Sequence, residues 1–374
     1  MNKGGLYFHV PFCLKKCDYC DFCSFPKVDE AQKDRYVRAL ITEMEGRAEA
    51  ARETLFDTLF FGGGTPTLLS ERALYEILDA AHRLFSVSEG AEVTIESNPA
   101  TADREKLTAM REMGFNRLSI GVQSFSDGEL ASLGRVHTAR DAVAFYECAI
   151  ACGFDNVNLD LMYGIPWQTE ENWKKTLAEV VRLSPAHISA YSLILEEGTP
   201  LAERKSTLSL PTEEEEDAFD LVLKETLAEH GYRHYEISNY AKEGRECRHN
   251  LHYWRSEPYL GFGVSAYSFF GGERYGNGRD LSAYLLAPLG QTADRECLTD
   301  EALAYEWLML RLRLAEGLSL RAYEEAFGYR FEERYADTVK KYVSMGLMKQ
   351  TPKRVFLTER GMRLSNTILV DFLA

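Results

Sequence analysis

The chain has 374 residues, of which 45% are hydrophobic and 27% charged, so it is long enough for two domains and too apolar to be disordered. Its 43 basic side chains stand against 58 acidic ones, a net charge of −15, which argues against nucleic acid or anionic lipid as partners. No signal-peptide pattern opens the chain, and no apolar run approaches the roughly 18–20 residues of a membrane span. We therefore expect a cytoplasmic protein with no nucleic-acid partner and at most peripheral membrane contact.

Short apolar runs alternate with longer helical patterns over the first 230 residues. The predicted strands are Leu6–Phe12, Thr58–Phe61, Glu92–Ser97, Arg117–Val122, Val157–Met162 and His187–Ile194. The predicted helices are 30–51, 71–85, 103–113, 139–152, 170–182 and 213–230. Six strand–helix units predict an α/β fold with a parallel sheet, either doubly wound or a barrel. Polar motifs follow nearly every strand rather than one switch point, which favours a barrel.

The pattern changes after residue 232. Tyr232–Tyr240 predicts a strand, followed by a polar turn and a stretch rich in glycine and tyrosine, 253–284. The predicted elements beyond 300 are the helices Ala302–Ala315, Leu320–Phe327 and Glu332–Met345 and the strand Val355–Leu357, which precedes Thr358–Gly361. Three helices with a small β wing resemble a winged-helix module. We therefore divide the chain into a barrel (1–235), a barrel extension (236–299) and a C-terminal winged-helix-like domain (300–374).

A winged helix is often a DNA-binding module, but the charge of this one is nearly balanced. Residues 301–374 carry 12 Lys and Arg against 10 Asp and Glu. A DNA-binding face needs a dominant positive charge, so we expect no nucleic-acid binding here. A small basic cluster is the one candidate for peripheral membrane contact; it comprises Lys349, Lys353, Arg354, Arg360 and Arg363.

Four of the eight cysteines fall within eleven residues, directly after the first predicted strand. Cys13, Cys17 and Cys20 have the spacing C-x3-C-x2-C, and Cys23 follows. Three thiolates in one loop can bind three irons of a 4Fe–4S cube and leave the fourth iron open. An open iron can chelate the amino and carboxylate groups of S-adenosylmethionine, and an electron passed to the sulfonium then cleaves a C–S bond. A zinc knuckle and a closed four-cysteine cluster that includes Cys23 are the alternatives.

The second predicted strand ends in residues 62–67, GGGTPT. Glycine permits positive φ and close backbone approach, so bare N–H and C=O groups can meet the amino and carboxylate groups of a ligand. A triple glycine alone would be only a tight turn. Here the triple glycine follows the three cysteines by one strand–helix unit. In that position it predicts a binding site for S-adenosylmethionine.

Together these motifs resemble the radical S-adenosylmethionine superfamily, and within it the branch of coproporphyrinogen III dehydrogenases and HemW proteins. The residues that carry the resemblance are Tyr7–Phe12, 62–67 (GGGTPT), 96–99 (ESNP), 121–125 (GVQSF), 133–135 (LGR) and 158–169 (NLDLMYGIPWQT). The resemblance covers nearly the whole chain. It implies a partial (β/α)6 barrel with cluster and cofactor at the C-terminal ends of the strands.

The resemblance also implies a set of binding residues. Cys13, Cys17 and Cys20 would be the cluster ligands. The residues at the S-adenosylmethionine site would be Tyr7, Tyr19, Gly63, Gly64, Thr65, Glu96, Gln123, Arg135 and Asp160. Arg135 would pair with the carboxylate of the cofactor. A glycine-rich stretch at 261–267, GFGVSAY, is similar to a loop of the branch and would place Ala266 and Tyr267 at the edge of the same site.

Three features separate the two functions of the branch. The dehydrogenases have a cysteine two residues after the third ligand, where this chain has Phe22, and they carry a longer segment before their cysteines. The run 248–254, RHNLHYW, contains H-N-x-x-Y-W, a marker of HemW-type sequences. Those sequences often have Asn at the position of Cys23, so the role of Cys23 stays open.

The resemblance therefore favours a heme chaperone that delivers heme or a porphyrin to acceptor proteins. His249 or His252 could supply an imidazole to heme iron, Cys247 a thiolate, and Tyr253 and Trp254 could pack on the macrocycle. Alternatively, the run only closes the barrel mouth. An oxygen-independent coproporphyrinogen III dehydrogenase is the second hypothesis, and an Fe–S electron carrier the third. The branch includes monomers and dimers, and an electron donor would be needed wherever S-adenosylmethionine is cleaved.

Overall fold

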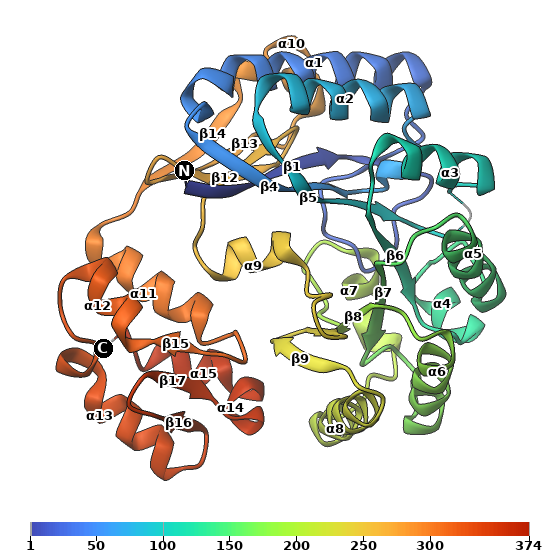
Figure 1. Cartoon of the computed structure of the whole chain (residues 1–374). Helices are drawn as coiled ribbons and strands as arrows, with labels where there is room; N and C mark the ends of the chain where they lie inside the picture. The colour runs from blue at the N-terminus through green and yellow to red at the C-terminus, as the bar shows by residue number, and fades with distance from the viewer. Residues whose placement is uncertain (1, 100, 374) are drawn as a thin grey trace.

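One twelve-stranded sheet runs through the larger part of the molecule. The computed structural model describes residues 2–99 and 101–373 (Figure 1). The strand order is β14-β13-β12-β11-β1-β4-β5-β6-β7-β8-β10-β9. From β11 to β8 all neighbours pair in parallel, and antiparallel strands extend both ends.

The six predicted strand–helix units are confirmed. The parallel strands are β1 (Asn2–Val10), β4 (Thr54–Gly63), β5 (Ser86–Ser97), β6 (Arg117–Gln123), β7 (Val157–Tyr163) and β8 (His187–Ser192). The helices on the outer face are α1 (Glu30–Ala48), α2 (Glu71–Leu84), α3 (Arg104–Met113), α5 (Ala139–Ala151), α6 (Glu170–Leu183) and α8 (Glu213–Glu229). Figure 1 shows these helices outside a curved sheet. The sheet stays open between β1 and β8, which makes it the expected partial barrel.

Short elements close the loops between these units. They are β2 (Phe12–Cys13), β3 (Phe25–Pro26), α4 (Asp127–Ser132) and α7 (Pro200–Glu203). β2 and β3 pair in parallel and bring the two ends of the cysteine loop together.

The single strand predicted at Tyr232–Tyr240 is wrong. Two antiparallel strands occupy this region, β9 (Arg233–Glu236) and β10 (Asn239–Ala241). The carboxylate of Glu236 causes the reversal, because it accepts hydrogen bonds from the backbone N–H of Ser238, at 2.8 Å, and from the side chain of Asn239. Side chains that bond to their own turn compete with the strand ladder.

The barrel extension contains elements that the sequence pattern did not predict. They are α9 (Arg248–Trp254), β11 (Tyr259–Phe262), β12 (Tyr267–Phe270), β13 (Glu273–Asn277), α10 (Leu281–Leu286) and β14 (Thr292–Cys297). The helix α9 lies where a polar turn was expected. β11 inserts beside β1, which puts residues some 250 positions apart in the chain on neighbouring strands.

The C-terminal unit has its own hydrophobic core. Its elements are α11 (Asp300–Arg311), β15 (Leu318–Ser319), α12 (Leu320–Phe327), α13 (Phe331–Ser344), β16 (Met348–Gln350), β17 (Arg354–Leu357), α14 (Glu359–Arg363) and α15 (Ser365–Val370). The three longer helices α11, α12 and α13 and a three-stranded antiparallel sheet match the winged-helix-like expectation, and the short helices α14 and α15 follow the sheet. The core packs aromatic rings such as those of Tyr323 and Phe331 and is separate from the core of the barrel. The boundaries at 235/236 and 299/300 stay predictions.

Candidate functional site

Alternation along the strands decides which side chains enter the barrel. In β1, Leu6, Phe8 and Val10 are fully buried in the core on the helix side, so Tyr7 and His9 point to the inner face. The same alternation places polar residues of the other strands inside, among them Ser119 of β6 and Asp160 of β7. The inner face is therefore polar and hydrogen-bonded where the outer face is apolar.

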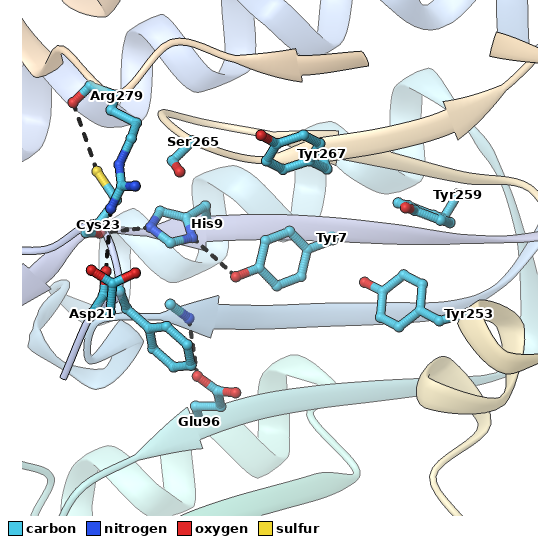
Figure 2. A pocket seen from close by; sticks show the side chains of 12 residues that line it. Tyr7, His9, Asp21, Cys23, Glu96, Tyr253, Tyr259, Ser265, Tyr267 and Arg279 are labelled. Carbon is cyan, nitrogen blue, oxygen red and sulfur yellow. Dashed lines mark hydrogen bonds between the residues drawn. The ribbon is translucent and has the colours of Figure 1, made fainter. Parts of the chain in front are cut away.

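Two adjoining cavities open on this inner face. The larger, about 460 Å³, is lined by Tyr7, His9, Asp21, Phe22, Cys23, Gly63, Glu96, Tyr253, Tyr259, Ser265, Tyr267 and Arg279 (Figure 2). The smaller, about 220 Å³, is lined by Tyr7, Phe60, Glu96, Arg117, Ser119, Asn158, Asp160, Ser189, Tyr191, His249, Asn250 and Tyr253. Tyr7, Glu96 and Tyr253 belong to both walls. A ligand in one cavity therefore touches residues that also face the other.

The cysteine loop follows β1 and presents its thiols beside the larger cavity. Cys13, Cys17, Cys20 and Cys23 are all free and partly exposed. Burial raises the pKa of Cys13 and of Cys20, and both thiols are close enough to Cys17 for its charge to raise their pKa further. Within residues 2–99 and 101–373, no three His, Cys, Asp or Glu side chains form a site for a single metal ion.

Two residues, Thr65 after β4 and Arg135 after α4, contact the thiols of this loop. A guanidinium nitrogen of Arg135 lies 3.3 Å from Cys17 Sγ, and Thr65 Oγ1 lies 3.8 Å from Cys13 Sγ. A cation and a hydroxyl at these distances stabilise thiolates. The donor set thus fits a 4Fe–4S cluster in which three irons each take one thiolate from the loop.

Cys23 differs from the other three thiols because it faces the larger cavity. Its Sγ lies 3.7 Å from the carbonyl oxygen of Arg279, and its own carbonyl oxygen lies 2.9 Å from His9 Nε2. Figure 2 shows Cys23 between Arg279 and His9. His9 Nδ1 in turn lies 3.0 Å from the hydroxyl of Tyr7.

The triple glycine is required by close packing at the end of β4. Gly63 has a φ of +111°, and its N–H donates to Glu96 at 3.0 Å. A Cβ at Gly64 would lie 2.6 Å from the carbonyl oxygen of Phe12, so no side chain fits there. Thr65 continues the contact, because its N–H donates to the same carbonyl at 2.7 Å.

Two buried carboxyls of the site hold protons unusually tightly. Burial and the neighbouring Asp160 raise the pKa of Glu96 to about 8. Burial also raises the pKa of Asp160, whose carboxylate accepts hydrogen bonds from Asn158 at 2.8 Å and Ser119 at 3.1 Å. Glu96, whose pKa is about 8, is able to donate as well as accept near neutral pH.

Some predicted site residues lie apart from the two cavities. Gly64, Thr65, Gln123, Arg135, Ala266, Tyr19 and Trp254 line neither of them. Gln123 sits in the left-handed region, with φ +69°. Tyr19 packs on the small apolar cluster of Leu133 and Met162, and Ala266 is buried. Arg135 donates to Asn98 and to the carbonyl of Gly121, while its Nε is buried without a partner.

Both histidines of α9 are buried and have their ring nitrogens occupied. His249 lies 2.7 Å from Thr58 Oγ1 and 2.7 Å from the hydroxyl of Tyr253. His252 contacts Glu257 and lies 2.7 Å from Asp57, and these carboxylates raise its pKa to about 9 although burial opposes the shift. The partners of these ring nitrogens are side chains and not backbone groups.

The other two heme candidates of this run are also engaged. Cys247 is fully buried, with its Sγ 3.7 Å from Glu92. Trp254 is half-buried beside Glu236. Of the residues suggested for heme, Tyr253 alone lines the larger cavity.

Sequence reasoning missed several residues of the site. Alternation in the first predicted strand would have placed His9 beside Tyr7, and alternation in Arg117–Val122 would have placed Arg117 beside Ser119. Nothing in the sequence signalled Arg279, because it reaches the cavity from the distant barrel extension.

Comparisons with known proteins agree with this geometry. The model of the Radical SAM superfamily matches residues 7–180, and that of the HemN C-terminal domain matches residues 298–364. The chain is 36% identical to the protein named heme chaperone HemW of Bacillus subtilis (strain 168), over 98% of both chains. It is 33% identical to the heme chaperone HemW of Escherichia coli (strain K12), over 99% of this chain and 98% of that one.

A solved structure has the same fold over nearly the whole of this chain. It is coproporphyrinogen III oxidase (HemN) from Escherichia coli, described as a radical SAM enzyme; its TM-score is 0.87 and its identity 25%, and the match covers 99% of this chain and 90% of that one. The α/β barrel followed by a mainly helical C-terminal unit is thereby confirmed. This chain belongs to the HemW family of the radical SAM superfamily.

Proposed function

We propose that this protein is a heme chaperone, which binds heme and delivers it to acceptor proteins. The observation that carries the proposal is the likeness, along the whole chain, to relatives named heme chaperone HemW. The HNxxYW run supports it, because α9 places Tyr253 on the wall of the larger cavity.

Cys13, Cys17 and Cys20 would hold a 4Fe–4S cluster, with S-adenosylmethionine beside it. When bound, this pair supplies an electron that can cleave the sulfonium, and an electron-donor protein would then be a partner. A guanidinium nitrogen of Arg135 lies 3.3 Å from Cys17 Sγ, and its Nε, which has no partner within residues 2–99 and 101–373, is the donor left for a carboxylate. Gly63 and Glu96 lie on the cavity wall, where a ligand's amino group would meet them.

Four more assigned positions need a different account. Ala266 is buried behind Tyr267, so Tyr267 would make the direct contact with a ligand in the larger cavity. Tyr19, Gln123 and Gly64 would act by shaping the backbone around the cofactor, because they do not line that cavity.

The heme itself would lie against tyrosines of the larger cavity. Tyr253, Tyr259 and Tyr267 offer aromatic faces and hydroxyls there, as Figure 2 shows. For His249 or His252 to reach the iron, its ring would first have to release Tyr253, Asp57 or another partner. We therefore place heme contact first at Tyr253 and treat the histidine ligand as a second step.

The partners we propose are heme, its acceptors and an electron donor, with no nucleic acid, and the protein would act in the cytoplasm as a monomer or dimer. No helix in the described part of the chain has both the length and the apolar character to cross a membrane. In the basic cluster proposed for peripheral contact, Arg354 already pairs with Glu316 at 3.5 Å and Arg363 with two aspartates of α8. Those ion pairs leave less charge for a lipid surface.

The test is a titration of heme into anaerobically reconstituted protein. We expect a Soret shift that saturates at stoichiometric heme, followed by loss of that band when an apo heme protein is added. Absence of any Soret shift would refute the chaperone proposal.

A second function, oxygen-independent coproporphyrinogen III dehydrogenase, is favoured by the TM-score of 0.87 with the HemN structure. It predicts conversion of coproporphyrinogen to protoporphyrinogen when S-adenosylmethionine and a reductant are added. The same preparation serves for both assays, so a heme-binding protein that forms no product separates the two functions.

A further inference from the structure

A buried guanidinium whose Nε has no hydrogen-bond partner within residues 2–99 and 101–373 lies on the wall of the smaller cavity. Arg117, the first residue of β6, is 2% exposed. In the described part of the chain, its Nε is buried without a partner. Its cross-strand neighbour Thr94 is fully buried, and the hydroxyl of Thr94 also lacks a partner. A buried N–H donor without a hydrogen-bond partner is costly to fold, so its presence needs an explanation.

Other arginines of this protein show what a structural role looks like. Arg47 forms a buried ion pair with Glu43 at 2.6 Å. Arg111 donates to the carbonyl of Phe115 at 2.6 Å and stacks over Phe154. Arg117 has neighbours of opposite charge at longer range, Glu92 and Asp160 among them, but no ion pair.

The surroundings of Arg117 suit a small anion. The cavity of about 220 Å³ is lined by the hydroxyls of Ser119, Ser189 and Tyr191 and the amides of Asn158 and Asn250. It is too small for a porphyrin ring but has room for a short carboxylate arm. Two carboxyls also line it, and one of them, Glu96, has its pKa raised to about 8 by burial and by Asp160, so this carboxyl is able to donate to an anion near neutral pH.

The position of the cavity indicates where the carboxylate comes from. Tyr253 and Glu96 belong to both cavity walls, so a ring held in the larger cavity lies next to the entrance of the smaller one. We propose that Arg117 is a carboxylate-binding residue that pairs with one propionate of the porphyrin bound in the larger cavity. This inference rests on the proposed function and adds the residue that orients the cargo.

Heme and its dimethyl ester, which differ only in the propionate charges, test the inference. We expect reconstituted wild-type protein to bind heme about 10- to 100-fold more tightly than the ester, the range of charge-assisted hydrogen bonds. Arg117→Met should bind both equally, with unchanged affinity for S-adenosylmethionine. An Arg117→Met protein that still prefers heme by the wild-type factor would overturn the proposal.

Stability and a matched variant separate ligand binding from folding. Arg117→Met should not lower the urea midpoint, because it replaces an unpaired buried charge by an apolar chain. Arg111→Met should lower the midpoint and leave the ratio of heme to ester affinities unchanged. A lowered midpoint for Arg117→Met with an unchanged ratio would assign Arg117 to structure instead.

Sodium succinate tests the other source of a carboxylate. We expect it to compete with heme in the wild type and not in Arg117→Met. If succinate binds but heme affinity stays unchanged, the smaller cavity binds a free carboxylate. That result would refute the proposal that Arg117 pairs with a heme propionate. If the wild type binds neither heme nor its ester, the chaperone proposal itself fails, whereas equal binding of both refutes only the role of Arg117.

Discussion

The loop after β1 and the helix α9 both carry residue types that can bind metals, but the side chains have opposite surroundings in the fold. The thiols of the loop are free and partly exposed, and a guanidinium nitrogen of Arg135 lies 3.3 Å from Cys17 Sγ. In α9 every ring nitrogen of His249 and His252 has a partner within the protein. Residue type therefore identifies possible ligands, but hydrogen bonding decides which of them are available at rest.

The largest expected effect is the loss of the iron–sulfur cluster when a ligand in the cysteine loop is removed. Cys17→Ala should abolish the brown absorption and most of the iron after anaerobic reconstitution, because one of three cluster ligands is lost. Cys23→Ala should keep most of both, since its thiol faces the larger cavity beside Arg279. Iron and acid-labile sulfide measured on both variants check this. Full iron in Cys17→Ala would overturn the ligand assignment.

The next effect tests whether His252 belongs to the structure. His252→Ala removes a buried cation between Asp57 and Glu257, and we expect unfolding free energy to fall by about 3 kcal/mol. Lys3 and Arg248 still pair with Asp57, which keeps the loss from being larger. Urea unfolding of the heme-free protein measures it. If His252→Ala is as stable as the wild type, the ion pairs of His252 are not needed for the fold, and the imidazole of the wild type would be available to bind iron.

A smaller effect comes from the pH dependence of the same ion pair. The folded pKa of His252, about 9, lies above its ordinary value near 6.5, so the stabilisation is complete below about pH 6.5 and is lost as pH rises through 9. Between pH 6 and 10 we expect wild type to lose about 2–3 kcal/mol more than His252→Gln. Urea midpoints across this range check the difference, and parallel curves for the two proteins would contradict it.

The smallest effect concerns Cys247. Its thiol is fully buried beside Glu92, and burial raises its pKa to about 12. Cys247→Ala should cost about 1 kcal/mol of unfolding free energy and leave heme affinity unchanged. Weaker heme binding in this variant, with an unchanged Soret maximum in Cys23→Ala, would make Cys247 the axial ligand.

Sequence periodicity predicted the barrel well because the apolar outer face of each strand repeats locally. Leu6, Phe8 and Val10 show this, and the helices between strands ended within a few residues of their predicted limits. The turn at Ile237–Ser238 escaped prediction, because Glu236 and Asn239 form it with side chains in an otherwise strand-like run. The helix α9 escaped because its His and Arg residues look like a polar turn.

The site was predictable only as far as its residues lie at strand ends. Glu96, near the end of its predicted strand, and Asp160, within Val157–Met162, could be assigned because they belong to the motifs that carry the family resemblance. The cavity also needs Arg279 and Tyr259, which arrive through the insertion of β11 beside β1, and no local pattern reports such a long-range pairing. The hydrogen bonds that occupy His249 depend on Thr58 of β4, 191 positions away.

The placement of β1 between β4 and β11 also sets an order for making the protein. One edge of β1 is covered once β4 is complete, but its other edge pairs with Tyr259–Phe262. At about 5–20 residues per second, the ribosome needs roughly 12 to 50 seconds to reach that segment. During this interval an edge of the strand that precedes the cysteine loop stays unpaired, and unpaired edges invite association with other chains. Nascent protein is thus most exposed to aggregation beside the site it will use.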